Sequence, residues 1–585
     1  MMAEVCLTFL NFEWVKGLST ALCSPPVAAP FVGYASCYWG VHARKELSRG
    51  VESLALKLLD GYDKHISSKL LLIHKRPQWR WRHPKREGGN ALEGFTGLHG
   101  AAYFGLVEIA HALLKTRRWD LWDLNATDFE GNTALAWAAR EGHEGMVKML
   151  LERGGMDPNT RDIYGLTPLL RAAWEGHGGV VKMLVKQVGV NPNTADDDGE
   201  TSLCGAAYGG HEGVVRVLLE RGNVNPDTAN QGGQTPLFIA ASRGRKGVVK
   251  MLLDRNDVNP NAADRHGQTP LCIAAGKGHE RAVKMLLERM DVNPNMADEH
   301  GLTPLFRAAR EGHERVVKML LERNDINPNT ADDDGETPLF RATWKAREGV
   351  VKMLLERGDV NPNTVDKHGW TPLFIAAQKG HEGVVKILLG RGDVNPNTAG
   401  DNGETPLFRA VLKGHEGVVK ILLTRGDVNP NTAGQYGQTP LFRAACEGHE
   451  GIVRILLERG DVNPNTTNDD DETPLFRAAW EGHEGVARIL LERGDVNPNT
   501  ADNHGETPLF IAACDGHERV VRILLEREDV NPNTADDDGT TPLFIAAWKG
   551  HEGVVRILLE RGDVNPNTTN DDDETPLFRD RKSVV

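Results

Sequence analysis

The sequence is poor in cysteine, in aromatic residues and in long apolar runs. It has seven cysteines among 585 residues, and 6% of its residues are aromatic. No two cysteines form a C-x-x-C pair, so neither a disulfide framework nor a paired-cysteine metal site is indicated. No stretch approaches the ~18 consecutive apolar residues of a membrane-spanning helix. These absences favour free thiols in a reducing compartment and predict no membrane association.

Positive charge is also in deficit. The net charge is −14, from 68 Lys and Arg against 82 Asp and Glu, which argues against general nucleic-acid binding. One basic stretch, Lys75 to Arg86, is the exception, and it is interpreted either as a nucleic-acid or nuclear-import signal or as a solvated linker. The apolar segment Val5 to Phe12 follows Glu4 without a basic run, which is not typical of a signal peptide. We expect a cytoplasmic protein, with a nuclear location as the alternative.

The motifs of phosphate and metal chemistry are missing too. The only Gly-Lys dipeptide begins at Gly276 and is followed by a second glycine, so no phosphate-binding loop is present. His-Glu recurs, as at His313, but Val317 stands where a metalloprotease needs its second histidine. Helices ~8–10 Å apart cannot let two such histidines share a zinc, so we interpret them as structural. The consecutive acids Asp332 to Asp334 lack the alternating spacing of a calcium loop. We predict no enzymatic activity, no cofactor and no metal.

A period of 34 residues organises the rest of the chain. Thr-Pro-Leu recurs in units that begin 34 residues apart, as at Thr269 and Thr303, and the register holds from Thr133 to Thr575. A degenerate unit begins earlier, at Thr96. Since each repeat of this length is one supersecondary unit that stacks on its neighbours, the period predicts a solenoid.

Each unit predicts two short helices and a protruding hairpin loop. In the unit that begins at Thr303, this threonine suits an N-cap, and Pro304 suits the first helical position. Gly312 ends the first helix, and Glu314 favours the start of the second. Asn327-Pro328 cannot continue a helix, and a polar, turn-rich segment follows it. The buried positions are expected at Leu305, Ala308, Ala309, Val316, Val317, Leu320 and Leu321.

The pattern Thr-Pro-Leu-x-x-Ala-Ala, Gly-His-Glu, Val-Val-x-x-Leu-Leu and Asp-Val-Asn resembles the ankyrin repeat. The resemblance covers residues 91–579, as 14 repeats and a truncated last one, with a short tail at 580–585. It implies an all-α ankyrin solenoid, monomeric and non-catalytic, that binds a protein partner on its concave face. Two features depart from the family pattern. The usual histidine after Thr-Pro-Leu occurs only as His99, with phenylalanine such as Phe306 later, and the period has one extra residue, in the Asn-Pro-Asn-Thr connection.

Residues 1–90 differ from the repeats, and we expect a helical segment and a basic linker there. The runs Pro30 to Ala35 and Tyr38 to Gly40 resemble the segment between NACHT domain and repeats in fungal NACHT–ankyrin proteins. The run Phe95 to Ala102 resembles the beginning of their first repeat. This resemblance implies an alternative function, the ligand-sensing arm of a fungal NOD-like receptor, a signal-transducing NTPase whose NACHT domain is absent from this chain.

Two sets of surface positions change from repeat to repeat, whereas the core positions do not. One follows the Ala-Ala pair of the first helix, and the other lies at the hairpin tip. By the ankyrin resemblance both line the concave face, where large aromatics and arginines favour binding, although some could instead pack on neighbouring repeats. The candidate partner-binding residues are Trp174, Tyr208, Arg310, Trp344, Trp370, Gln378, Tyr436, Trp480 and Trp548.

The C-terminal end is expected to be the least stable part of the array. A new unit begins at Thr575 but has no second helix. Internal repeats bury apolar surface on both sides, so we expect the preceding second helix to be partly uncovered and to fray first. The residues concerned are Val554, Val555, Leu558 and Leu559.

Overall fold

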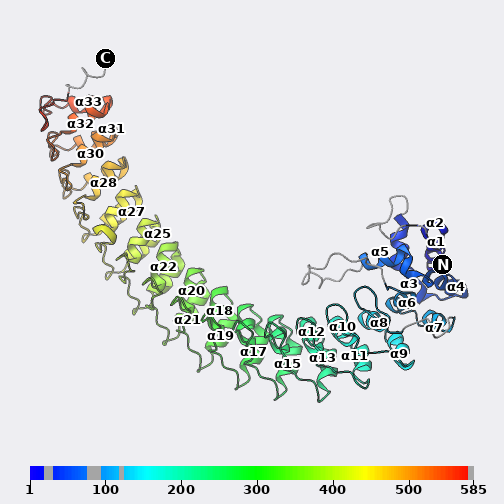
Figure 1. Ribbon diagram of the computed structural model, residues 1–585. Coiled ribbons are helices and arrows are strands. Elements are labelled where there is room, and N and C mark those ends of the chain that lie inside the picture. The colour runs from blue at the N-terminus through cyan, green and yellow to red at the C-terminus, as the bar shows by residue number, and fades with distance from the viewer. Residues whose placement is uncertain (17, 19–29, 75–93, 117–123, 577–585) are drawn as a thin grey trace. The chain divides into compact units, whose positions relative to one another are not determined.

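The computed structural model describes residues 1–16, 18, 30–74, 94–116 and 124–576, and those ranges contain helices and loops but no β-strand (Figure 1). The chain divides into two compact units, Met1–Glu299 (unit 1) and His300–Val585 (unit 2). The basic stretch Lys75 to Arg86 and the tail 580–585 lie outside the described residues. In the described part of the chain, no helix is long and apolar enough to cross a membrane.

Unit 1 begins with helices that precede the repeats. α1 contacts α3 and α4, and these two in turn contact α6, the first helix of the first repeat. The Trp39 ring is fully buried and lies 4.9 Å from the Phe104 ring. These helices therefore cover the apolar end of the first repeat. Their bounds are α1 (Met2–Leu10), α2 (Glu13–Lys16), α3 (Pro30–Lys45), α4 (Arg49–Leu59), η1 (Tyr62–Lys64) and α5 (Ile66–His74).

From α6 onward the helices come in pairs, so that each repeat has a first helix with an even number and a second helix with an odd number. In unit 1 the pairs are α6 (Gly97–Phe104), α7 (Val107–Thr116), α8 (Ala134–Arg140), α9 (Glu144–Glu152), α10 (Pro168–Glu175), α11 (Gly178–Leu184), α12 (Ser202–Gly209), α13 (Glu212–Leu219), α14 (Pro236–Ser242), α15 (Lys246–Leu253), α16 (Pro270–Gly276) and α17 (Glu280–Leu287).

Unit 2 continues the same pattern, with one short 3-10 turn, η4, at a hairpin tip. Its elements are α18 (Pro304–Glu311), α19 (Glu314–Leu321), α20 (Pro338–Trp344), α21 (Glu348–Leu355), α22 (Pro372–Lys379), α23 (Glu382–Leu389), α24 (Pro406–Leu412), α25 (Glu416–Leu423), η4 (Gln435–Gly437), α26 (Pro440–Cys446), α27 (Glu450–Leu457), α28 (Pro474–Trp480), α29 (Glu484–Leu491), α30 (Pro508–Cys514), α31 (Glu518–Leu525), α32 (Pro542–Lys549) and α33 (Glu552–Leu559).

The predicted helix boundaries are confirmed in the repeat that begins at Thr303. Its hydroxyl oxygen accepts a hydrogen bond of 3.2 Å from the backbone N–H of Phe306, and Pro304 occupies the first helical position. Gly312 ends α18 with a φ of 84°, a left-handed conformation that favours glycine. The second helix begins at Glu314, whose charge suits the positive end of the helix dipole.

The phenylalanine that replaces the usual histidine forms the centre of the core in unit 2. Each of these rings is fully buried beneath its own repeat, where an apolar ring needs no hydrogen-bond partner. The fully buried rings are Phe306, Phe340, Phe374, Phe408, Phe442, Phe476 and Phe510.

The prediction for the last complete repeat was only half right. Leu559 is 51% exposed, and Val555 is partly exposed. Val554 and Leu558, in contrast, are fully buried. The reason is that α33 packs against α32 and α31, so the helix face turned toward these two neighbours is covered without any following repeat.

Candidate functional site

In many repeats a histidine at the N-cap of the second helix bonds to the first helix of the repeat before it, and we call this row of bonds the histidine ladder. His211 Nε2 lies 2.9 Å from the carbonyl oxygen of Trp174, and His517 Nε2 lies 2.8 Å from that of Trp480. A carbonyl oxygen only accepts, so Nε2 carries the proton in each case. Where arginine replaces the histidine the bond persists, since Arg245 Nε donates to the Tyr208 carbonyl at 3.2 Å. The structural interpretation is confirmed for the histidines that make this bond.

Two further ladders, one of arginine and one of asparagine side chains, run along the loops that follow the second helices. Arg391 pairs through Nε and Nη2 with Asp393, at 2.9 and 2.5 Å, and its Nη1 donates to the Leu355 carbonyl of the preceding repeat at 3.0 Å. Asn363 donates to the Asp393 carbonyl at 2.7 Å and accepts from the Asn395 N–H at 2.8 Å. Within unit 2 the Asn-Pro-Asn-Thr connection therefore bonds neighbouring repeats to one another.

The ladders fix the backbone beneath the residues that vary. We use the term variable surface for the nine candidate residues named from the sequence. In unit 1 two of its residues, Trp174 and Tyr208, form a row with Arg243 of the following repeat, which lies beside the variable surface. The Trp174 and Tyr208 rings lie 5.1 Å apart, and the Arg243 guanidinium carbon lies 4.0 Å from the centre of the Tyr208 ring. A cation at this distance from an aromatic face is attracted by the ring quadrupole.

Three tryptophans of unit 2 share this arrangement of ring and cation. Trp480 and Trp548 are 37% and 46% exposed, and Trp344 is partly exposed. They therefore present part of each ring to solvent and hold a positive charge beside it. The cations and their distances from the ring centres are Lys379 over Trp344 at 4.5 Å, Arg477 over Trp480 at 4.6 Å and Lys549 over Trp548 at 5.4 Å.

The remaining residues of the variable surface differ in how firmly they are held. Arg310 Nε lies 2.9 Å from a carboxylate oxygen of Glu311, and Gln378 is partly exposed. Tyr436 is 62% exposed at a hairpin tip, where its φ of 61° turns the chain. Trp370 instead stacks on Phe374, with ring centres 5.3 Å apart and planes inclined by 14°. Trp370 thus packs its hairpin onto the first helix in addition to facing solvent.

Sequence reasoning missed a second set of varying residues, four positions after the repeat threonine. Arginine and isoleucine exchange there, as in Arg409 and Ile375. Arg409 Nε lies 3.1 Å from a carboxylate oxygen of Glu404, and Arg341 pairs in the same way with Glu336. Burial raises the pKa of Glu336 to about 7. The sequence pattern that could have predicted these pairs is a glutamate directly before the repeat threonine together with an arginine four residues after it.

The acidic hairpin tips are stabilised by hydrogen bonds within their own turns. Asp332 Oδ1 accepts hydrogen bonds from the backbone N–H groups of Asp334 and Glu336, at 3.0 and 2.9 Å. This is the local bonding by which aspartate stabilises turns. Across the described ranges, no group of three His, Cys, Asp or Glu side chains could hold a metal ion.

Comparison with known protein families identifies the repeats. The family model described as ankyrin repeats (3 copies) matches overlapping segments that together span residues 67–570. The chain belongs to the ankyrin-repeat family. Ankyrin repeats generally mediate protein–protein interactions, and ankyrin-repeat proteins are generally non-catalytic scaffolds. The matched segments are 67–162, 98–196, 169–264, 223–298, 256–332, 290–366, 346–433, 426–502 and 495–570.

Among solved structures, the chain is similar to the ankyrin repeat domain of Bcl-3, described as a unique member of the IkappaB protein family. The two are 28% identical over 36% of this chain and 94% of that chain, with a TM-score of 0.34. A search of curated proteins finds no match. The family model and the solved structure described above concern ankyrin repeats, so the resemblance of the N-terminal segment to fungal NACHT–ankyrin proteins stays a prediction.

Proposed function

We propose that the chain is a monomeric, non-catalytic scaffold that binds a protein partner through its variable surface, on the concave face of the ankyrin array. One observation carries this proposal. The histidine ladder holds the equivalent carbonyl oxygen in many repeats, whereas the side chain on that residue changes from tryptophan to tyrosine or glutamine. A constant backbone with varied, partly exposed side chains is a rigid surface on which recognition can differ from repeat to repeat.

The side chains present suit a protein partner. Partly exposed tryptophan and arginine are the residues that most often dominate the energy of protein interfaces. Because neighbouring cations already contact the rings and the ladders hold the backbone beneath them, binding would cost little side-chain entropy. The mixture of aromatic rings and cations favours a partner segment that carries both apolar and acidic side chains.

Affinity capture with the immobilised full-length chain tests this proposal. Three forms are compared against the same lysate, namely the wild-type chain, a variant with alanine at Trp344, Trp480 and Trp548, and a control. The wild type and the control should capture the same polypeptide in equal amounts. The tryptophan variant should capture at least about tenfold less of it. Equal capture by all three forms would refute binding at the variable surface. The control carries alanine at exposed lysines of second helices: Lys352, Lys386 and Lys420.

A further inference from the structure

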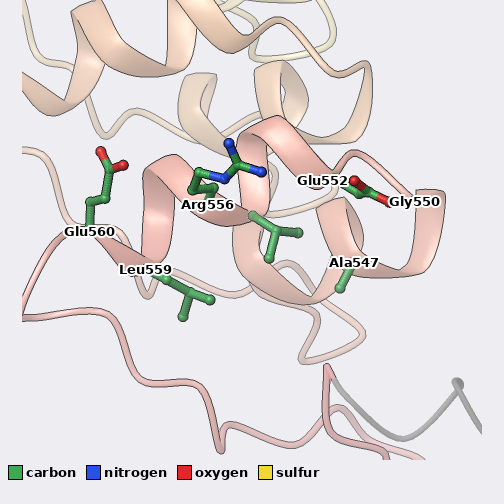
Figure 2. A pocket seen from close by; sticks show the side chains of 7 residues that line it. Ala547, Gly550, Glu552, Arg556, Leu559 and Glu560 are labelled. Carbon is green, nitrogen blue, oxygen red and sulfur yellow. The ribbon is translucent and has the colours of Figure 1, made fainter.

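The outer side of the last complete repeat holds a groove of about 480 Å³ (Figure 2). Ala547, Val555 and Leu559 line it with apolar atoms, and Glu552 and Arg556 stand beside them. Leu559 is 51% exposed, whereas Leu525 of the preceding repeat is only partly exposed, and Val555 is partly exposed whereas the equivalent Val521 is fully buried. The groove thus exposes the kind of surface that internal repeats bury when they stack.

The internal repeats show what fits on such a surface. The second helix α29 is covered by α31, the second helix of the next repeat. Two ion pairs accompany this contact. Arg519 of α31 lies 3.3 Å from Glu484 of α29, and Glu526 at the end of α31 lies 3.9 Å from Arg488 of α29. Apolar side chains lie between the two pairs, so α31 matches α29 both in shape and in charge.

The helix α33 presents the same two charges as α29. Glu552 stands 68 residues, or two periods, after Glu484, and Arg556 stands two periods after Arg488. A covering helix would therefore place a basic or small residue opposite Glu552, a glutamate opposite Arg556, and apolar residues between them. A small residue also fits, because Gly553 of α33 faces Glu518 of α31 closely.

We propose that this groove binds an amphipathic helix of a protein partner that has the residue order of α31. The chain's own last nine residues, 577–585, do not have that order, because they contain no glutamate and have three basic residues within four positions. The inference concerns a surface separate from the variable surface and does not depend on the proposed function. It makes the exposed face of α33 a second binding site, which recognises a helix as α29 recognises α31.

The test uses a fluorescein-labelled, helix-constrained peptide with the sequence of residues 516–528, titrated with the full-length chain by fluorescence anisotropy. We expect saturable binding that weakens at least about tenfold in Leu559→Glu, because a charge replaces the apolar wall of the groove. Leu559 is largely exposed, so this variant should keep its fold, which circular dichroism checks. Lys420→Glu is the matched control, since Lys420 occupies the position of Arg556 four repeats earlier, and it should bind as the wild type does.

A charge exchange fixes the orientation of the bound helix. Arg556→Glu should weaken binding, and a peptide with Glu526→Arg should restore it on that variant only. Absence of saturable binding, or unchanged affinity in Leu559→Glu and Arg556→Glu, would overturn the proposal. So would sedimentation that shows a concentration-dependent dimer lost in Leu559→Glu, because a second copy of the chain would then occupy the groove.

Discussion

The first repeat should be sensitive to acid because of one buried histidine. His99 is fully buried, its Nδ1 accepts from the Thr96 N–H at 3.1 Å, and its Nε2 donates to the carbonyl oxygens of Asn132 and Ala126, at 3.0 and 3.1 Å. The imidazole is therefore neutral, with one nitrogen accepting and the other donating. Burial lowers the pKa of His99 to about 4, and the two carbonyl hydrogen bonds offset only part of this effect.

The sign of the pH dependence follows from the direction of this change. Between pH 6.5 and about 4 the unfolded chain binds a proton at this position and the folded chain does not, so stability falls as the pH falls. A pKa lowered from 6.5 to about 4 corresponds to about 3 kcal/mol of folding free energy that is present at neutral pH and fully lost below pH 4. The loss should be concentrated in the first repeat, since terminal units of a solenoid open locally.

The variant His99→Phe, which installs the residue of later repeats, should remove this pH dependence. Native-state hydrogen exchange at residues 97–104 is measured at pH 7, 5.5 and 4.5 in both proteins. The opening free energy should decline with pH in the wild type and stay nearly level in the variant, whatever its value at pH 7. An offset between the two proteins that is the same at every pH would refute the reasoning. His266→Gln is the control. Glu299 raises the pKa of this exposed histidine, so the contribution of His266 to stability has the opposite sign and is lost as the pH rises.

Three further predictions concern unit 2. Phe442→Ala removes a fully buried ring and should lower the free energy of unfolding by about 3–5 kcal/mol in urea denaturation. Arg459→Ala removes the pairing with Asp461 and the bond to the Leu423 carbonyl, so amides in the last turn of α25 should exchange about tenfold faster, with no change in circular dichroism. Glu336 binds its proton more tightly in the folded chain, so stability should fall as the pH rises from 4.5 through about 7, and thermal melts of Glu336→Gln should lack this decline.

The fold of each repeat could be predicted because its signals are local. A threonine cap, a proline at the first helical position and a glycine at the end act within a few residues, and the sequence repeats them at most periods. The period then predicted the solenoid. Local signals also explain the error at Val554 and Leu558. Their helical spacing predicts that they are buried, but it does not indicate whether they face the preceding repeat or the following one.

The candidate site could be predicted only in part. Variation between repeats indicated which positions differ, but not which of them also stabilise the hairpins, as Trp370 does against Phe374. The arginine and glutamate pairs, such as Arg409 with Glu404, could not be predicted from the sequence. An arginine at that position looks like an ordinary solvated charge, because its partner comes close only when the hairpin packs onto the helix. The ladders join atoms in different repeats, and a pattern within one repeat cannot reveal them.

The histidine ladder keeps the same hydrogen bond when the side chain at the position after the Ala-Ala pair differs. Cys446, Trp480 and Cys514 occupy the same position in three successive repeats. In each case the ladder bond goes to the backbone carbonyl oxygen and not to the side chain. A small thiol and a large ring therefore leave the same hydrogen bond in place, and selection on the side chain is free of the requirement to hold the repeats together. The bonds are His483 to Cys446 at 3.0 Å, His517 to Trp480 at 2.8 Å and His551 to Cys514 at 2.9 Å.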